Sequence, residues 1–282
     1  MVEMQNDQRY IDRLGRAEDA DIDLVRAALD LAACQNPGRD HARYLNHSAT
    51  LIDNVAQGYS QMCDAGAAND CATRLAALKR ELADHQGYAG DDRNYEDIHN
   101  ADLMHVIDRR KGMPVALAIL YIHVARGQGW VCQGLNFPGH FIIRLVSGSE
   151  RLIVDPFNRA NVLQAPDLRA IIKQVQGEDA ELSADYYEPV SNRETLIRLQ
   201  NNVKLRQIEM ADYQRALASV QAMQAIAPDD HRLALDAGVV YARTNHPQAA
   251  IKALEFYIDN VDNDKDRRDA NILLRHIRGQ FS

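Results

Sequence analysis

His140 and Asp155 are the residue types from which the base half of a nucleophilic triad is built. A carboxylate beside an imidazole fixes the tautomer of the ring and stabilises the imidazolium that forms when the ring takes a proton. Such a pair activates a nucleophile for attack on an amide or an ester. The chain therefore carries the means of general-base chemistry if its fold brings these two side chains together.

A predicted β-hairpin would bring them together. The sequence Ser147-Gly148-Ser149-Glu150 indicates its turn, and two loop residues in this turn would place His140 opposite Phe157. Asp155 would share the sheet face of Phe157, since alternate side chains on a strand point the same way. His140 and Asp155 then become diagonal neighbours within hydrogen-bonding reach. Two simpler roles stay open: the aspartate, which precedes a proline, could only initiate a turn, and the histidine could only stabilise the hairpin.

The missing nucleophile is expected at the N-terminus of a buried helix, where the helix dipole lowers the pKa of a thiol. Residues 114–125 are almost wholly apolar, and Pro114 suits the first turn of a helix. We predict that this segment is a helix buried on all sides. It carries no nucleophile, because nothing from Gly112 to Ala118 is Cys, Ser or Thr.

Other side chains offer alternative chemistry. Cys132, on a neighbouring predicted strand, could be a relocated nucleophile or simply a small buried apolar residue. His99, Asp102 and His105 recur at three-residue spacing, which fits either a metal site or a polar helix face. Asn100 could be a helix cap, a loop anchor or a catalytic amide. We predict no metal and no cofactor for this chain.

The elements that must position these residues indicate an α+β fold. Apolar residues at three- and four-residue spacing predict an N-terminal group of amphipathic helices over residues 21–84, followed by a polar loop over residues 87–97. Three short β-like runs follow the buried helix, at residues 130–135, 140–146 and 151–157. We predict that the buried helix packs on a small antiparallel sheet made from these runs.

The C-terminal part is predicted to be a pair of tetratricopeptide-like helical repeats. Ala216 and Ala250 are 34 positions apart, which is the period of that repeat. Gly238 takes the place of a small residue in the second unit, where paired helices cross closely. The first unit is degenerate, because Lys204 stands where a small residue is usual. We place the domain boundary between residues 188 and 189, giving domains 1–188 and 189–282.

Composition excludes several classes of protein. The 282 residues carry a formal net charge of −8, which argues against a general nucleic-acid binder. No window is apolar enough for a membrane span, and the polar N-terminus is unlike a secretory signal, so we predict a cytoplasmic protein. The four cysteines form no C-x-x-C pair and predict neither a disulfide framework nor a zinc site.

Three motifs together resemble the SirB1 family of transglutaminase-like proteins. They are Arg110-Lys111-Gly112-Met113-Pro114-Val115-Ala116-Leu117-Ala118, Asn136-Phe137-Pro138-Gly139-His140-Phe141 and Val154-Asp155-Pro156-Phe157. The preceding Asn100-Ala101-Asp102-Leu103 is similar to the Asn-Ser-x-Leu entry of that family, with Ala101 in place of the serine. The resemblance spans residues 21–281. It implies a papain/transglutaminase-like core followed by tetratricopeptide repeats.

The resemblance also implies roles for the site residues. His140 and Asp155 match the histidine and aspartate of transglutaminase-like enzymes. The pattern Gly-x-Cys-x-x-x-Ala, laid on Gly112 and Ala118, puts Pro114 where the catalytic cysteine belongs, and neighbouring registers offer only Val115 or Ala116.

The sequence therefore favours a pseudoenzyme, a non-catalytic interaction or regulatory scaffold that binds a protein partner through its helical repeats, with no nucleic acid or membrane partner and with the oligomeric state open. The alternative is an amide or ester hydrolase or an acyl transferase, with His140 as base, Asp155 orienting it, and Cys132 or a water as nucleophile. A metal-dependent hydrolase that uses His140 with His99 or His105 is a third hypothesis.

Overall fold

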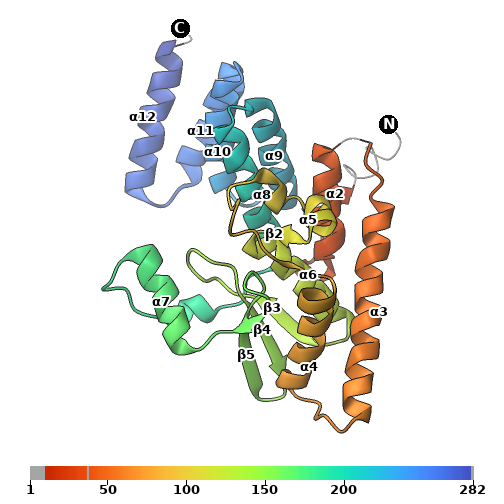
Figure 1. Ribbon diagram of the computed structural model, residues 1–282. Coiled ribbons are helices and arrows are strands. Elements are labelled where there is room, and N and C mark those ends of the chain that lie inside the picture. Colours follow the sequence, from red (N-terminus) through yellow and green to blue (C-terminus); the bar gives the residue numbers. More distant parts are fainter. Residues whose placement is uncertain (1–9, 37, 281–282) are drawn as a thin grey trace. The chain divides into compact units, whose positions relative to one another are not determined.

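The computed structural model describes residues 10–36 and 38–280 (Figure 1). They form two compact units, one of residues 19–199 and the other of residues 10–18 together with 200–280. The division falls inside helix α8 (Asn192–Glu209). The domain boundary at residue 188 stays a prediction. Within the described ranges no helix combines the length and the apolar character that a membrane crossing requires.

The N-terminal helices of the first unit are confirmed. After the short 3₁₀ turn η1 (Asp19–Asp21) come α2 (Leu24–Gln35), α3 (Ala42–Asp64) and α4 (Cys71–Leu78), and α4 continues into a π-helical segment, η2 (Lys79–His85). Aspartate side chains begin two of these helices: Asp23 accepts hydrogen bonds from the first turn of α2, and Asp70 accepts one from the backbone N–H of Thr73 in α4.

The predicted buried helix is α6 (Pro114–Gly127). Pro114 occupies its first turn, where a missing N–H leaves no hydrogen bond unmade. Every residue from Pro114 to Ile122 is buried. Helices α2, α3, α4 and α5 (Leu103–Arg109) and strand β3 (Val131–Gly134) contact it, so this helix is the centre of the unit (Figure 1).

The predicted antiparallel sheet is also confirmed. Strands β3, β4 (Ile143–Ser147), β5 (Glu150–Asp155) and β6 (Asn161–Val162) lie in that order. Ser147 pairs with Glu150, so the hairpin has the predicted two-residue turn. The β4 strand begins later than predicted, and His140 precedes it. Gly139, with φ of 72°, turns the chain just before this histidine, and this left-handed conformation interrupts a strand.

Sequence patterns missed the shortest strands. The polar loop predicted over residues 87–97 contains β1 (Ala89–Gly90), which pairs in parallel with β2 (Lys111–Gly112) just before α6. Two residues are too few to give a periodic signal. The other elements of the unit are η3 (Ile98–Ala101), α7 (Ala165–Gln176) and η4 (Ala184–Tyr187). Leu168 and Ile172 of α7 join a buried cluster with Phe137 and Ile142.

The second unit is helical. Its helices after α8 are α9 (Tyr213–Ile226), α10 (Arg232–Arg243), α11 (Pro247–Asn260) and α12 (Asp264–Gln280) (Figure 1). The small residues of the repeat lie where helices meet: Ala216 and Ala250 are fully buried. A Cβ added to Gly238 of α10 would lie 2.7 Å from Cγ of Leu254 in α11, so this crossing requires glycine.

Two features go beyond the predicted pair of repeats. Lys204, the residue that makes the first unit degenerate, is buried, and its Nζ lies 2.6 Å from Oδ2 of Asp236 in α10. An ion pair to the next repeat thus replaces the usual small residue. Helix α12, which follows the two predicted repeats within the predicted helical domain, places Leu274 and Ile277 against Ala250 and Leu254 of α11 and so covers the end of the array.

The α10–α11 crossing gives a test of this packing. Gly238→Val is expected to lower the free energy of unfolding by about 1–3 kcal/mol, because the new methyl groups overlap the fully buried Leu254. Gly279→Ala is the matched control, since nothing lies within 4 Å of its added Cβ. Urea unfolding followed by circular dichroism measures both. Equal stability of the two variants would contradict the close crossing.

Candidate functional site

The structure brings His140 and Asp155 together. Nε2 of His140 lies 2.9 Å from Oδ2 of Asp155. The carboxylate is 1% exposed, while the imidazole keeps 16% of its surface accessible. The ring of His140 also meets that of Phe157 edge to face at 6.0 Å, although neither residue belongs to the paired part of β4 and β5. In this arrangement the carboxylate of Asp155 fixes the orientation of the His140 ring, as in the base half of a nucleophilic triad.

Both roles that the sequence left open for Asp155 are realised, one on each oxygen. Oδ1 accepts hydrogen bonds from the backbone N–H groups of Phe157 and Asn158, at 2.9 and 3.3 Å. Oδ2 accepts one from the side-chain amide of Asn158 at 2.7 Å and faces His140. Asp155 thus initiates the turn after β5 and pairs with the histidine. The contribution of Asn158 was not predicted, although a turn-forming asparagine after Asp-Pro is a usable signal.

The surroundings of Asp155 favour its ionised form. Burial by itself raises the pKa of this carboxyl, but the hydrogen bond and charge of His140, with the hydrogen bonds from Asn158, outweigh burial and hold the pKa below its ordinary value of 3.8. At neutral pH the site therefore holds a buried carboxylate beside an imidazole that solvent can reach.

Arg198 of α8 fixes the loop that carries His140. Its guanidinium donates hydrogen bonds to the carbonyl oxygens of Phe137 and His140, both at 3.1 Å. The same group lies over the ring of Phe141, 5.2 Å from its centroid. Sequence analysis missed this residue, because an arginine within a distant helix gives no local signal of the loop that it contacts.

Phe157 links the His–Asp pair to the start of α6. A Cβ added to Gly90 would lie 2.5 Å from the ring of Phe157, so the ring packs directly on this glycine. The N–H of Gly90 also donates to the carbonyl of Phe157 at 2.8 Å. Gly90 pairs with Gly112, which lies just before Pro114. This series of contacts connects the histidine to the N-terminal end of α6.

The start of α6 is held by Asn100 and offers no nucleophile. The backbone carbonyl of Asn100 accepts a hydrogen bond from the N–H of Met113 at 3.0 Å, and its side-chain amide donates to the carbonyl of Asn94 at 2.7 Å. Asn100 is therefore an anchor of the loop that precedes the helix. Pro114, Val115 and Ala116, which offer no thiol or hydroxyl, are all buried.

The structure gives no support to Cys132 as a relocated nucleophile. Burial raises the pKa of this thiol to about 12, and its side chain is 1% exposed. Cys132 pairs with Leu145 in the middle of β4, whereas His140 precedes that strand. Among the other cysteines, Cys71 is buried, and burial also raises the pKa of its thiol, while Cys34 and Cys63 are half-buried.

The three residues of the metal hypothesis take part in contacts with other side chains. His99 Nδ1 lies 2.8 Å from Asp97, and His105 Nδ1 lies 3.1 Å from Asp102. The rings of His99 and His105 are 4.3 Å apart. Over residues 10–36 and 38–280, no group of three or more His, Cys, Asp or Glu side chains is arranged to hold a metal ion.

A buried helix against an antiparallel sheet, with a His–Asp pair at its edge, is the architecture of a transglutaminase-like protein. Residues 42–201 match the transglutaminase-like superfamily, and residues 203–275 match the tetratricopeptide repeat. The chain belongs to the transglutaminase-like superfamily, as its motifs predicted, and carries a repeat tail.

The curated relatives match this chain over very different shares of their own length. A UPF0162 protein from Xylella fastidiosa (strain Temecula1 / ATCC 700964) is 28% identical over 250 residues, which cover 87% of this chain and 86% of that protein. A UPF0162 protein from Vibrio cholerae is 28% identical over 196 residues, covering 69% and 72%. F-box only protein 21 from Homo sapiens is 27% identical over 172 residues, covering 57% of this chain and 26% of that protein. No matching solved structure was found.

The His–Asp pair predicts a pH-dependent contribution to stability. Asp155→Asn is expected to lower the free energy of unfolding at pH 7 by about 1–3 kcal/mol, because it removes the charge that pairs with His140. A depressed carboxyl pKa stabilises the folded state above the unfolded value of 3.8, and this contribution is lost as the pH falls through the lower folded value. The difference between wild type and variant should therefore shrink in acid.

Chemical unfolding at pH 7 and in acid measures this difference. Asp53→Asn, at an exposed aspartate of α3, is the control and should leave the stability unchanged at both pH values. A deficit of Asp155→Asn that stays constant into acid would show that the charge of Asp155 contributes nothing.

Proposed function

We propose that this chain is a non-catalytic protein-interaction scaffold, in which a degenerate transglutaminase-like core is joined to a helical tail that binds a partner protein. The observation that carries the proposal is the start of α6. A buried proline begins the helix at the position of the family's cysteine, and the following Val115 and Ala116 offer no substitute. A base without a nucleophile cannot carry out the family's covalent step.

The His–Asp pair is compatible with this proposal, because it also stabilises the local structure around the turn after β5. Asp155 holds the turn after β5 through three hydrogen bonds, and His140 lies against both Asp155 and Phe157. Removal of a buried carboxylate from such a set of donors is costly whether or not the protein is an enzyme. The contribution of the pair to the stability of the fold is therefore a sufficient reason for its presence.

A hydrolase or acyl transferase remains the alternative function. It would need a water, or a thiol other than the buried Cys132, close to the exposed part of the His140 ring. The high pKa of Cys132 makes its thiolate scarce at neutral pH, which favours the scaffold.

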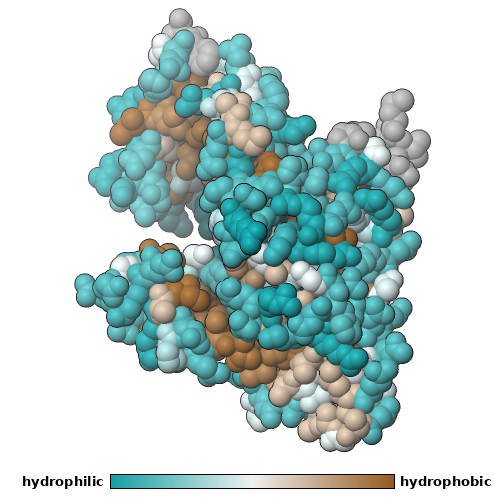
Figure 2. Space-filling view, viewed as in Figure 1, coloured by the Kyte–Doolittle hydropathy of each residue, from teal (hydrophilic) through white to brown (hydrophobic). Residues whose placement is uncertain are grey.

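The helical tail supports a role in binding protein. Tetratricopeptide arrays present extended surfaces on which a partner's helix or peptide can lie. In this unit Phe256 of α11 and Ile272 of α12 are 53% and 59% exposed. Figure 2 shows apolar side chains gathered over the region of α11 and α12. We infer a partner segment with apolar side chains, such as one face of an amphipathic helix.

Thiol reactivity tests the absence of a nucleophile. Iodoacetamide at neutral pH is expected to alkylate every cysteine of the folded protein more slowly than in the urea-unfolded chain, with Cys132 slowest because it is buried. His140→Ala should change none of these rates. Peptide mass spectrometry gives the rate at each cysteine. A thiol that reacts faster than in the unfolded chain, and is slowed by His140→Ala, would replace the scaffold with the cysteine enzyme.

Selection from a random peptide library tests the tail. Peptides enriched on the full chain are expected to carry apolar residues at helical spacing and to bind Ile272→Asp about tenfold or more weakly, since a buried aspartate lacks a partner there. Arg268→Asp introduces the same side chain at another exposed position of α12 and should bind as wild type does. The proposal fails if no peptide is enriched, or if both variants bind like wild type.

A further inference from the structure

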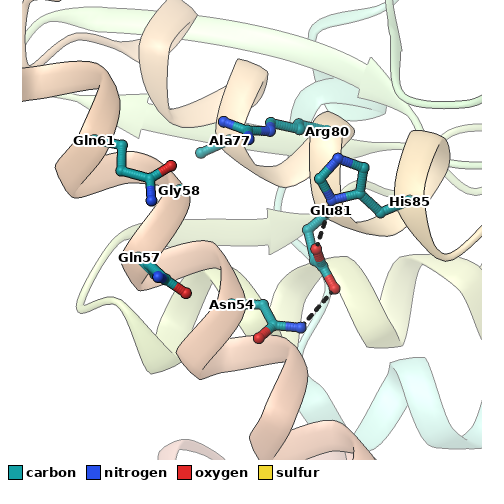
Figure 3. Close-up of a pocket in the computed structure, with 8 residues that line it drawn as sticks. All are labelled: Asn54, Gln57, Gly58, Gln61, Ala77, Arg80, Glu81 and His85. Atoms are coloured by element: carbon teal, nitrogen blue, oxygen red, sulfur yellow. Dashed lines mark hydrogen bonds and ion pairs between the residues drawn. The ribbon is translucent and has the colours of Figure 1, made fainter. Parts of the chain in front are cut away.

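A polar pocket lies between α3 and the segment formed by α4 and η2 (Figure 3), and neither His140 nor Asp155 lines it. Its volume is about 260 Å³. The side chains that could recognise a ligand come from two helical walls: Asn54, Gln57 and Gln61 from α3, and Arg80, Glu81 and His85 from η2.

Glu81 is a fixed negative charge in this pocket. It is 6% exposed, and its Oε1 accepts hydrogen bonds from the side-chain amides of Asn54 and Gln86, both at 2.9 Å. Its Oε2 lies 3.2 Å from Nδ1 of His85. Burial raises the pKa of Glu81, but these donors outweigh burial and hold it below the ordinary value, so the group is ionised at neutral pH. Oε2 still has room for one further donor.

Arg80 is a positive charge that no carboxylate pairs with in the part of the chain that the structure describes. Although it adjoins Glu81 in sequence, Figure 3 shows its side chain extending toward Ala77 and away from the Glu81 carboxylate. The amides of Gln57 and Gln61 likewise have no partner among the described residues. The pocket thus presents two separate opposite charges and two amides available for hydrogen bonding.

Two unusual backbone features lie in the walls of this pocket. Gly58 lies in the interior of α3, where glycine is less stable than alanine. A Cβ added there meets nothing within 4 Å, so no close contact explains the glycine, while the open space that it leaves is part of the pocket. The other wall is the π-helical η2, a rare form that recurs at functional sites.

The π-helical geometry serves Glu81 directly. The backbone N–H of Gln86 donates to the carbonyl of Glu81 at 2.9 Å, a bond that spans five residues instead of the usual four of an α-helix. Because this wider turn brings residue 86 back to residue 81, the Gln86 side chain also reaches the Glu81 carboxylate. The unusual backbone therefore fixes the acidic group of the pocket.

We propose that this pocket binds a small zwitterion of the α-amino acid class, with its carboxylate on Arg80, its ammonium group on Glu81, and polar side-chain atoms on Gln57 and Gln61. A simple anion would meet the charge of Glu81, and a simple cation would meet that of Arg80. A ligand that carries both charges satisfies each. The site does not depend on the proposed scaffold function, and its test leaves that function untouched.

Titration calorimetry with the full chain tests the proposal. The common free amino acids are screened at millimolar concentration, and at least one is expected to bind. Its N-acetyl derivative, which lacks the ammonium group, and its amide, which lacks the carboxylate, should each bind about tenfold or more weakly, since each loses one charge-assisted contact. The proposal is overturned if no amino acid binds, or if either derivative binds as well as the parent.

Variants locate the site. Arg80→Gln should weaken binding about tenfold or more. Gly58→Leu should abolish binding while leaving the Tm unchanged or higher, because its side chain fills open space. Arg151→Gln, at an exposed arginine of β5 outside the pocket, should bind as wild type does. Because Arg80 and Gly58 are not buried in the core, these variants are expected to fold, and wild-type affinity in both would place the ligand elsewhere.

Discussion

Helix α6 has no polar face, and the rest of residues 19–199 is arranged to cover it. A helix that is apolar all round gains stability only when every side is removed from water, so one packing partner is not enough. Helices α2, α3, α4 and α5 and strand β3 all contact α6. The small sheet covers only one side of α6, so helices are needed to cover the other sides. The same packing buries the start of α6.

The residue at the buried start of α6 also determines whether the site can hold a nucleophile there. A catalytic cysteine there would gain a lowered pKa from the helix dipole. Pro114 instead stabilises the start of α6, because proline is favoured in the first turn of a helix, where no backbone N–H donor is needed. Proline also carries no thiol or hydroxyl. The His–Asp pair persists beside it, since Asp155 is also the residue on which the turn after β5 is built.

Long-range contacts, more than the hairpin itself, set the geometry of the histidine. Arg198 holds the loop through the carbonyl oxygens of Phe137 and His140, and Phe157 packs between His140 and Gly90. Each contact joins segments far apart in the chain. The pocket beside η2 also depends on a contact between helices, because Asn54 of α3 donates to the Glu81 carboxylate of η2.

The sequence by itself determined the elements whose pattern is local or periodic. The apolar run from Pro114, the two-residue turn at Gly148 and Ser149, and the 34-residue spacing of Ala216 and Ala250 each predicted what the structure contains. It also predicted the His140–Asp155 contact, because hairpin register follows from turn length. Only the tertiary structure decided the rest: the two-residue strands β1 and β2, the contacts of Arg198, the ion pair of Lys204 and the burial of Cys132. These features depend on which distant segments come into contact and on how deeply each side chain is buried. The local spacing of residues in the sequence predicts neither.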